Sequence, residues 1–213
     1  MTDEAYRRQG LARKLIEHVV KQYKDSCDGF YLFANLDALD FYDKCGFSRE
    51  TEYQYKVKEE FCRNRSKGEW FVPVNTADVQ MKQKYMDMIR HSAANSSMEQ
   101  INKFGLQMFY TADMENVYYA KAIDCFIVAE TEENTLLLQS IICENQVALS
   151  DVLQRVRGEY HKCQLGFVPD LKDMDMCEAE KYDGSDDYRL FYFGEQLKSI
   201  EKEKLYFPKL SHA

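Results

Sequence analysis

The sequence Arg7-Arg8-Gln9-Gly10-Leu11-Ala12 leads directly into a helical pattern, because apolar residues recur at three- and four-residue spacing over residues 11–23. A glycine-containing turn that opens a helix is a natural phosphate site, since unpaired backbone N–H groups and the positive end of the helix dipole face one point. Gly10 permits close backbone approach, and the small side chain of Ala12 leaves room for a ligand. Three neighbouring cations can balance a pyrophosphate: Arg7, Arg8 and Arg13. The stretch predicts a pyrophosphate site, although an ordinary helix start would share these residue types.

The helix is followed by the patterns of a strand, a second helix and another strand. Residues 30–34 form a short, aromatic-rich run that favours a strand. Asn35 can cap a helix over about residues 36–44, and Gly46 can supply the left-handed residue that ends it. Alternating apolar side chains then indicate a strand over residues 52–58. The order helix, strand, helix, strand is typical of an α/β protein.

A second motif lies one strand downstream of the first. It reads Asn35-Leu36-Asp37-Ala38-Leu39-Asp40-Phe41-Tyr42-Asp43-Lys44-Cys45-Gly46-Phe47. Together the two motifs resemble those of the GNAT superfamily of N-acetyltransferases, which has a Q/R-x-x-G-x-G/A loop and helix, a strand, and then N-x-x-A-x-x-F-Y-x-x-x-G-F. The resemblance covers residues 5–58. It implies an α/β (α+β) fold with a mixed sheet flanked by helices.

This resemblance also implies a reaction and roles for individual residues. An amine would attack the thioester of acetyl-coenzyme A (acetyl-CoA) directly, and no metal is implied. The family implies that one segment binds the coenzyme A pyrophosphate through backbone amides and nearby cations: Arg7, Arg8, Gln9, Gly10, Leu11, Ala12 and Arg13. Asn35 would bind or position the pantetheine arm, and Tyr42 would be the general acid that protonates the departing thiolate. The alternative for Tyr42 is a core tyrosine on an aromatic-rich helix.

One departure from the family pattern concerns the start of the domain. A complete GNAT domain has several strands and helices before the loop, whereas six residues precede Arg7. Those residues cannot supply the strands that would pair with residues 30–34, nor the usual carboxylate base. Three explanations stay open: a truncated sequence, completion of the sheet by the second domain or another subunit, or an incomplete and inactive site. Because an exposed central strand promotes aggregation, we favour completion within the chain or by a partner in a homodimer.

A polar and charged segment, residues 59–68, is the best candidate linker in the chain. We therefore expect a partial GNAT segment over residues 1–68 and a second domain over residues 69–213. This second domain should include a mainly helical region over residues 78–101, interrupted by a new helix start near Asn95-Ser96-Ser97.

The second domain continues with a strand-rich pattern. The expected elements, in order, are strands 70–74, 117–122, 125–130 and 135–143, a helix 149–156, strands 160–168 and 176–182, a turn 183–185 and a strand 188–193. The order from residue 104 onward resembles a degenerate, mostly antiparallel GNAT-like domain. Residues 144–149 hold neither glycine nor a basic side chain, so this domain would have the fold without the coenzyme site.

Composition narrows the remaining classes of function. A net charge of −8 argues against general nucleic-acid binding. The seven cysteines form no C-x-x-C pair and the four histidines are dispersed, which favours reduced thiols in the cytoplasm and no metal site. The most apolar run, residues 136–143, is far shorter than the ~20 residues of a membrane span. We expect a cytoplasmic tandem-domain enzyme that acetylates a small-molecule or peptide amine. The competing hypothesis is a noncatalytic coenzyme A-binding or regulatory module.

Overall fold

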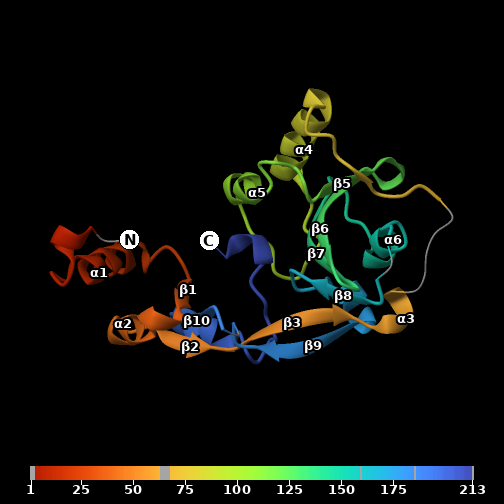
Figure 1. The fold of residues 1–213 in the computed structure, drawn as a ribbon. Coiled ribbons are helices and arrows are strands. Elements are labelled where there is room, and N and C mark those ends of the chain that lie inside the picture. The colour runs from red at the N-terminus through yellow and green to blue at the C-terminus, as the bar shows by residue number, and fades with distance from the viewer. Residues whose placement is uncertain (1–2, 63–67, 159, 185, 213) are drawn as a thin grey trace. The chain divides into compact units, whose positions relative to one another are not determined.

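The computed structural model describes residues 3–62, 68–158, 160–184 and 186–212, and the chain divides into two compact units (Figure 1). The first unit comprises residues 1–52 and 181–204, and the second comprises residues 53–180 and 205–213. This division differs from the expected boundary after residue 68, because the chain returns to the first unit near its C-terminal end. Part of the expected linker, residues 63–67, lies outside the described residues. Its first part forms helix α3 (Glu59–Cys62), in which Cys62 is fully buried.

The first unit contains a three-stranded sheet and two α-helices. Its elements are η1 (Glu4–Tyr6), α1 (Leu11–Tyr23), β1 (Phe30–Asn35), η2 (Leu36–Ala38), α2 (Leu39–Lys44), β2 (Ser48–Glu50), β10 (Tyr188–Phe193) and η5 (Glu195–Ser199). The order of the sheet is β1-β10-β2, and β10 runs antiparallel to both neighbours. The expectation that a later part of the chain would cover the N-terminal strand is thus confirmed for one edge of β1. The strand that does so had been assigned to the second domain, which we correct.

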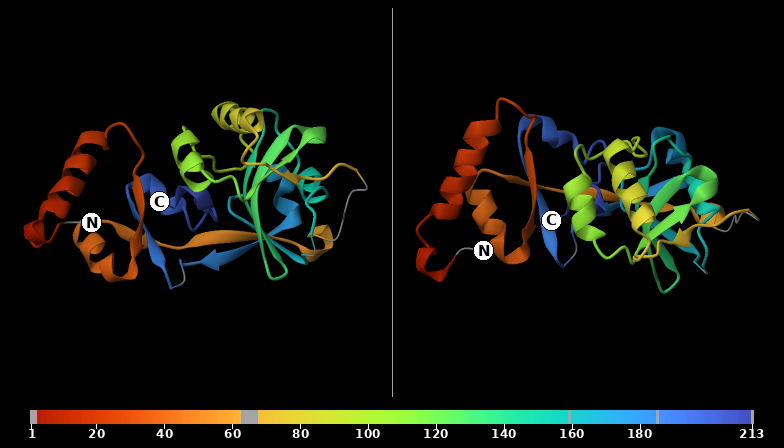
Figure 2. Two further views of the ribbon diagram at one scale, coloured as in Figure 1. Left: turned by 45° about the horizontal axis from the view of Figure 1, so that its top comes forward. Right: turned by 90° about the horizontal axis from the view of Figure 1, so that it is seen from above.

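Burial of aromatic side chains holds β10 between β1 and β2. Phe191 of β10 is 0% exposed and forms a buried cluster with Ala34 and Phe47. Both helices pack against this cluster through apolar side chains: Ile16, Val20, Leu39 and Tyr42. The two views of Figure 2 show α1 and α2 on the same side of the sheet. This face of the sheet therefore supports both motifs that the sequence identified.

The second unit is built on a seven-stranded sheet. Its elements are β3 (Glu52–Val57), α3, β4 (Val72–Pro73), α4 (Val79–His91), α5 (Phe104–Tyr110), β5 (Val117–Ala120), η3 (Lys121–Ile123), β6 (Cys125–Glu132), β7 (Thr135–Ile142), α6 (Leu149–Leu153), β8 (Lys162–Leu165), η4 (Leu171–Met176), β9 (Cys177–Tyr182) and η6 (Lys209–Ser211). The strand order is β4-β5-β6-β7-β8-β3-β9. Strands β6 and β7 form an antiparallel hairpin, while β7 and β8 are parallel and lie on either side of α6 in the sequence. The sheet is therefore mixed, as the α/β prediction required.

Helices cover both faces of the central strands. Figure 1 shows α4 and α5 on one side of β5, β6 and β7 and α6 on the other. Tyr85 of α4 packs against Phe126 of β6 with ring centroids 5.1 Å apart. Its buried hydroxyl donates to Thr111 Oγ1 (3.1 Å) and accepts from Gln107 Nε2 (3.2 Å). No helix among the described residues is both long and apolar enough to cross a membrane.

Two sequence expectations for this unit need correction. The region 78–101 contains one helix, which ends at His91, and Ser96 forms an isolated bridge with Pro169 instead of preceding a new helix. The next helix is α5, which the sequence analysis did not identify. Its polar residue Gln107 is buried because it serves the hydrogen-bond network of Tyr85, so the apolar periodicity is weak there.

The histidine near the C-terminus should make the fold sensitive to acid. Burial, with a smaller effect of Lys209, lowers the pKa of His212 from 6.5 to about 4. The unfolded chain therefore takes up this proton near pH 6.5, whereas the folded chain resists it until about pH 4. The part of the folding stability that depends on neutral His212 is fully present above pH 6.5 and is lost as the pH falls from 6.5 to about 4. We expect this group to lower the free energy of unfolding by about 3 kcal/mol across this pH range.

Urea unfolding at pH 7, 5.5 and 4.5 measures the effect of His212. A His212→Gln variant should lose less stability over this range than the unaltered chain, because glutamine does not titrate. Equal losses in the two proteins would assign the acid sensitivity to other groups.

Candidate functional site

The turn before α1 has the backbone geometry of an anion site. Arg8 and Gly10 both adopt positive φ, at 60° and 73°. Gly10 occupies the N-cap position, and no side chain caps the helix. The first intrahelical bond is from the Lys14 N–H to the Gly10 carbonyl (3.0 Å). Within the described part of the chain, the backbone N–H groups of residues 11–13 therefore have no acceptor, and they open at the positive end of a 13-residue helix.

The side chains around this turn leave it open and cationic. A Cβ built on Gly10 would meet nothing within 4 Å, so the backbone is accessible from that side. Arg7 lies 3.7 Å from Glu4 and Arg13 lies 2.8 Å from Glu17, in pairs that solvent screens. Arg8 has no carboxylate partner among the residues that the structure describes. The predicted pyrophosphate residues are thus contiguous, solvent-exposed and suited to a phosphate group.

Asn35 ends β1 and begins the segment of the second motif. The expected helix over residues 36–44 divides into η2 and α2, and Asn35 occupies the N-cap position of η2. The expected cap does not form, because the side chain of Asn35 makes no capping hydrogen bond. Its exposed amide group stays available to a ligand, so the predicted contact with the pantetheine arm stays a prediction.

Tyr42 lies on α2, and its ring has a structural role. As predicted, Gly46 ends the helix in the left-handed region, with φ of 87°. The Gly46 N–H donates to the Asp43 carbonyl (3.1 Å) and the Phe47 N–H to the Tyr42 carbonyl (3.2 Å), which is the Schellman pattern. The Tyr42 ring packs 5.7 Å from that of Phe191 and 6.2 Å from that of Phe47.

The hydroxyl of Tyr42 is separate from this packing. It makes no hydrogen bond within the described part of the chain, and the side chain is only partly buried. Burying a hydroxyl without a partner is costly, and the only partial burial of this side chain limits that cost. The ring of Tyr42 therefore packs on the buried cluster, and a catalytic role for its hydroxyl stays a prediction.

The two motifs meet at one place in the first unit. Ile16 of α1 and Tyr42 of α2 pack against the same buried cluster. Cys45, at the end of α2, lies close enough to α1 for Arg13 and Glu17 to influence its pKa, although burial is the main cause of the rise in that pKa. A raised pKa favours the neutral thiol, which is a weaker nucleophile than the thiolate.

Residues 1–47 match the Acetyltransferase (GNAT) family. This segment is a GNAT segment. The match ends at Phe47, so it includes both motifs and every predicted site residue. No curated protein matches the sequence significantly.

Solved structures extend the GNAT likeness to the rest of the fold. A GCN5-related N-acetyltransferase from Kribbella flavida aligns with 90% of this chain at 13% identity, with a TM-score of 0.52. A probable N-acyltransferase from Enterococcus faecalis V583 aligns with 90% at 15% identity, with a TM-score of 0.50. The alignments cover 50% and 51% of those proteins, so this chain spans about half their length. At such identities they show a shared fold.

The second unit differs from the GNAT segment at the corresponding helix start. The N–H of Leu149, the first residue of α6, donates to the Asp173 carboxyl group (3.3 Å). Asp173 is buried, and burial raises the pKa of its carboxyl group. A side chain of the protein thus accepts a hydrogen bond from this helix start, and the expectation that the second domain lacks a coenzyme site stays a prediction.

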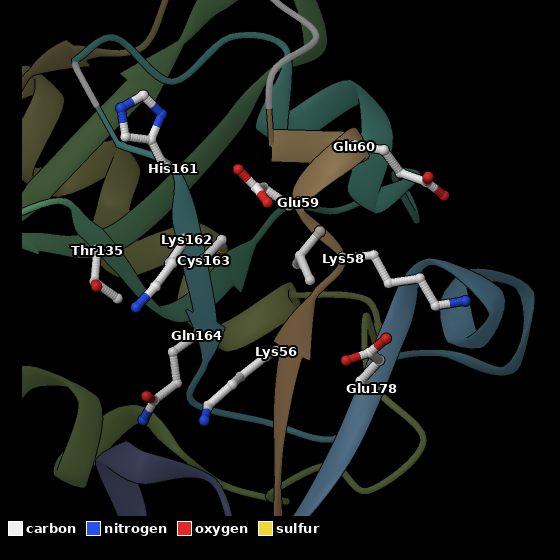
Figure 3. Close-up of a pocket in the computed structure, with 11 residues that line it drawn as sticks. Lys56, Lys58, Glu59, Glu60, Thr135, His161, Lys162, Cys163, Gln164 and Glu178 are labelled. Atoms are coloured by element: carbon white, nitrogen blue, oxygen red, sulfur yellow. The ribbon is translucent and has the colours of Figure 1, made fainter.

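An open pocket of about 880 Å³, which no sequence pattern indicated, lies on the sheet of the second unit (Figure 3). It lies where β3 and β8 run antiparallel, and its polar lining consists of Lys56, Lys58, Glu59, Glu60, Thr135, His161, Lys162, Gln164 and Glu178. Lys56 pairs with Glu180, and Lys58 Nζ donates to the Asp175 carbonyl (2.7 Å). Because both signs of charge line the pocket, it favours no single class of ligand. No group of three metal-binding side chains occurs in the described ranges.

Proposed function

We propose that this chain is an acetyl-CoA-dependent N-acyltransferase whose coenzyme site is the turn before α1. The observation that carries the proposal is the set of open N–H groups at residues 11–13 within a GNAT segment. Such groups, with the positive helix end and the adjacent arginines, match the charge and hydrogen-bonding needs of a pyrophosphate. Asn35 contacts or positions the pantetheine arm of the same substrate.

The proposed reaction is direct transfer to an amine. The neutral amine attacks the thioester carbonyl carbon, a tetrahedral intermediate forms, and its collapse breaks the carbon–sulfur bond. Tyr42 donates its hydroxyl proton to the departing thiolate. A phenol, at about 10, and a thiol, at about 8.5, have ordinary pKa values close enough for this transfer. The hydroxyl of Tyr42, which has no hydrogen-bond partner among the described residues and belongs to a partly buried side chain, supports the assignment.

The acceptor is a small-molecule or peptide amine, and the setting is the cytoplasm. Seven cysteines that are all free thiols, four of them buried, suit a reducing compartment. The alternative function is a noncatalytic coenzyme A-binding or regulatory module with an incomplete acceptor site. Release of free coenzyme A thiol with a panel of amines supports the enzyme. Binding without turnover supports the module.

We further propose that the enzyme works as a homodimer. Strand β1 is an edge strand of its sheet, and its six residues carry no charge to discourage pairing. Four exposed apolar side chains line α1 at four-residue spacing: Leu11, Leu15, Val19 and Tyr23. A second copy can cover this edge and this stripe together. Light scattering of the purified chain distinguishes one copy from two.

Replacing Gly10 by valine should weaken the binding of acetyl-CoA by at least about tenfold. The residue adopts φ of 73°, which a β-branched side chain tolerates poorly, and the turn must shift to relieve the strain. Even about 1.4 kcal/mol of lost binding energy corresponds to a tenfold weaker complex. Isothermal titration with acetyl-CoA measures the change.

Gly158→Val is the matched control for this variant. Gly158 also has positive φ, at 122°, has open space around it and lies in the second unit. It imposes comparable backbone strain, so it should leave the affinity for acetyl-CoA unchanged. Equal affinities of the Gly10 variant and the unaltered chain would remove the turn from the coenzyme site.

A further inference from the structure

A second, apolar pocket lies in the second unit on the side of the sheet that faces α6. Its volume is about 260 Å³, and it is lined by Phe71, Val72, Pro73, Tyr118, Ile127, Ala129, Thr131, Leu136, Val156 and Arg157. All of these residues belong to the second unit, whereas the residues of the coenzyme site proposed above belong to the first. We refer to it as the apolar pocket.

The walls of the apolar pocket come from the most buried part of the unit. Ile127 and Leu136 are each 1% exposed, and Ala129 and Phe71 are almost as deeply buried. Protein interiors leave few voids larger than one water molecule, whose share of the liquid is about 30 Å³. A space several times larger among such side chains is therefore a place for a ligand. The small side chain of Ala129 helps to keep it open.

The mouth of the apolar pocket carries a cation. The Arg157 guanidinium stacks on the ring of Trp70 at 5.6 Å and is exposed. It forms no ion pair with any described residue, whereas its neighbour Arg155 lies 3.5 Å from Asp151. A stacked guanidinium keeps its planar fork of donors in place, which suits two-point binding of a carboxylate.

We propose that the apolar pocket binds a small carboxylic acid with an apolar body, such as an aryl-alkanoic or medium-chain acid. The body fills the space between Phe71, Ala129 and Leu136, and the carboxylate pairs with Arg157 at the mouth. A body of about ten carbon atoms suits this volume, because ligand sites are mostly apolar with a few polar groups that fix orientation. Charge complementarity selects an acid over an amine.

Fluorescence of Trp70 offers a direct test, because the chain has one tryptophan and Arg157 stacks on it. The probes are 4-phenylbutyrate, 4-phenylbutanol and 4-phenylbutylamine, which share one body and differ in charge. We expect a saturable change with the acid, at least tenfold weaker binding of the alcohol, and no binding of the amine. No saturable change with the acid, or equal affinity for all three probes, would overturn the proposal.

Two variants distinguish the contribution of the Arg157 charge to binding from that of the apolar space. Arg157→Gln should weaken binding of the acid at least tenfold and leave the alcohol unaffected, while Ala129→Leu should fill the space and abolish binding of both. Arg90→Gln is the matched control, since Arg90 also stacks on an aromatic ring, that of Phe104, away from the pocket. Saturation-transfer NMR on the probes gives a readout that does not depend on Trp70.

A second variant, at the exposed rim of the apolar pocket, can replace Ala129→Leu in this experiment. If Ala129→Leu does not fold, Thr131→Leu narrows the pocket from a position outside the core. Unchanged binding of the acid in a folded filling variant, or in Arg157→Gln, would contradict the proposed site.

Discussion

Tyr42→Phe should lower the rate of acetyl transfer by about 100-fold or more while leaving the affinity for acetyl-CoA unchanged. A positioned general acid contributes about 10²- to 10⁴-fold to such reactions. The substitution removes only the hydroxyl, which has no hydrogen-bond partner within the described residues. The ring contacts with Phe47 and Phe191, and the end of α2, are retained. Release of coenzyme A thiol measures the rate, and isothermal titration measures the affinity.

A tyrosine elsewhere in the first unit controls for loss of a hydroxyl. Tyr6 is 58% exposed and precedes the turn, so Tyr6→Phe should leave both rate and affinity unchanged. A Tyr42→Phe enzyme with the full rate would restrict Tyr42 to its packing role.

The helix start of α1 and the end of α2 could be predicted from the sequence, because each depends on residues that are close together in the chain. A helix start without a side-chain cap, and a glycine in the left-handed region after α2, each depend on a few consecutive residues. Both features occur where the motifs placed them. The predicted capping role of Asn35 was wrong, because Asn35 precedes a 3-10 turn and its side chain makes no capping hydrogen bond.

The partner of β1 could not be predicted by such reasoning. β10 follows β1 by more than 150 residues, and its alternating aromatic pattern fits a strand in either unit. What places it in the first unit is the shape of the buried cluster around Phe191 and Phe47. Helix α5 was not predicted for a related reason. Its buried residue Gln107 donates a hydrogen bond to the hydroxyl of Tyr85, which is distant in the sequence.

Phe191→Ala should destabilise the first unit by about 3 to 5 kcal/mol and release β10 from the sheet. The Phe191 side chain is 0% exposed and packs against the ring of Tyr42. The Arg49 guanidinium lies over the Phe191 ring, 5.6 Å from its centroid, in a cation–π interaction. Truncating a buried phenylalanine removes its transfer free energy and leaves a cavity. This loss is a large share of the about 5 to 15 kcal/mol that stabilises a domain. Acetyl-CoA binding should weaken as well, because α1 and α2 rest on the same cluster.

Hydrogen exchange measured by mass spectrometry can localise this loss to one unit. Peptides from β1 and α2 should exchange faster in Phe191→Ala, while those from β6 and β7 keep their protection, since these strands belong to the second unit. Phe109→Ala is the control, because Phe109 is 73% exposed and its removal should change stability by less than about 0.5 kcal/mol. Equal protection of β1 in Phe191→Ala and the unaltered chain would contradict the pairing of β10 with β1, and the first unit would then need another strand to complete its sheet.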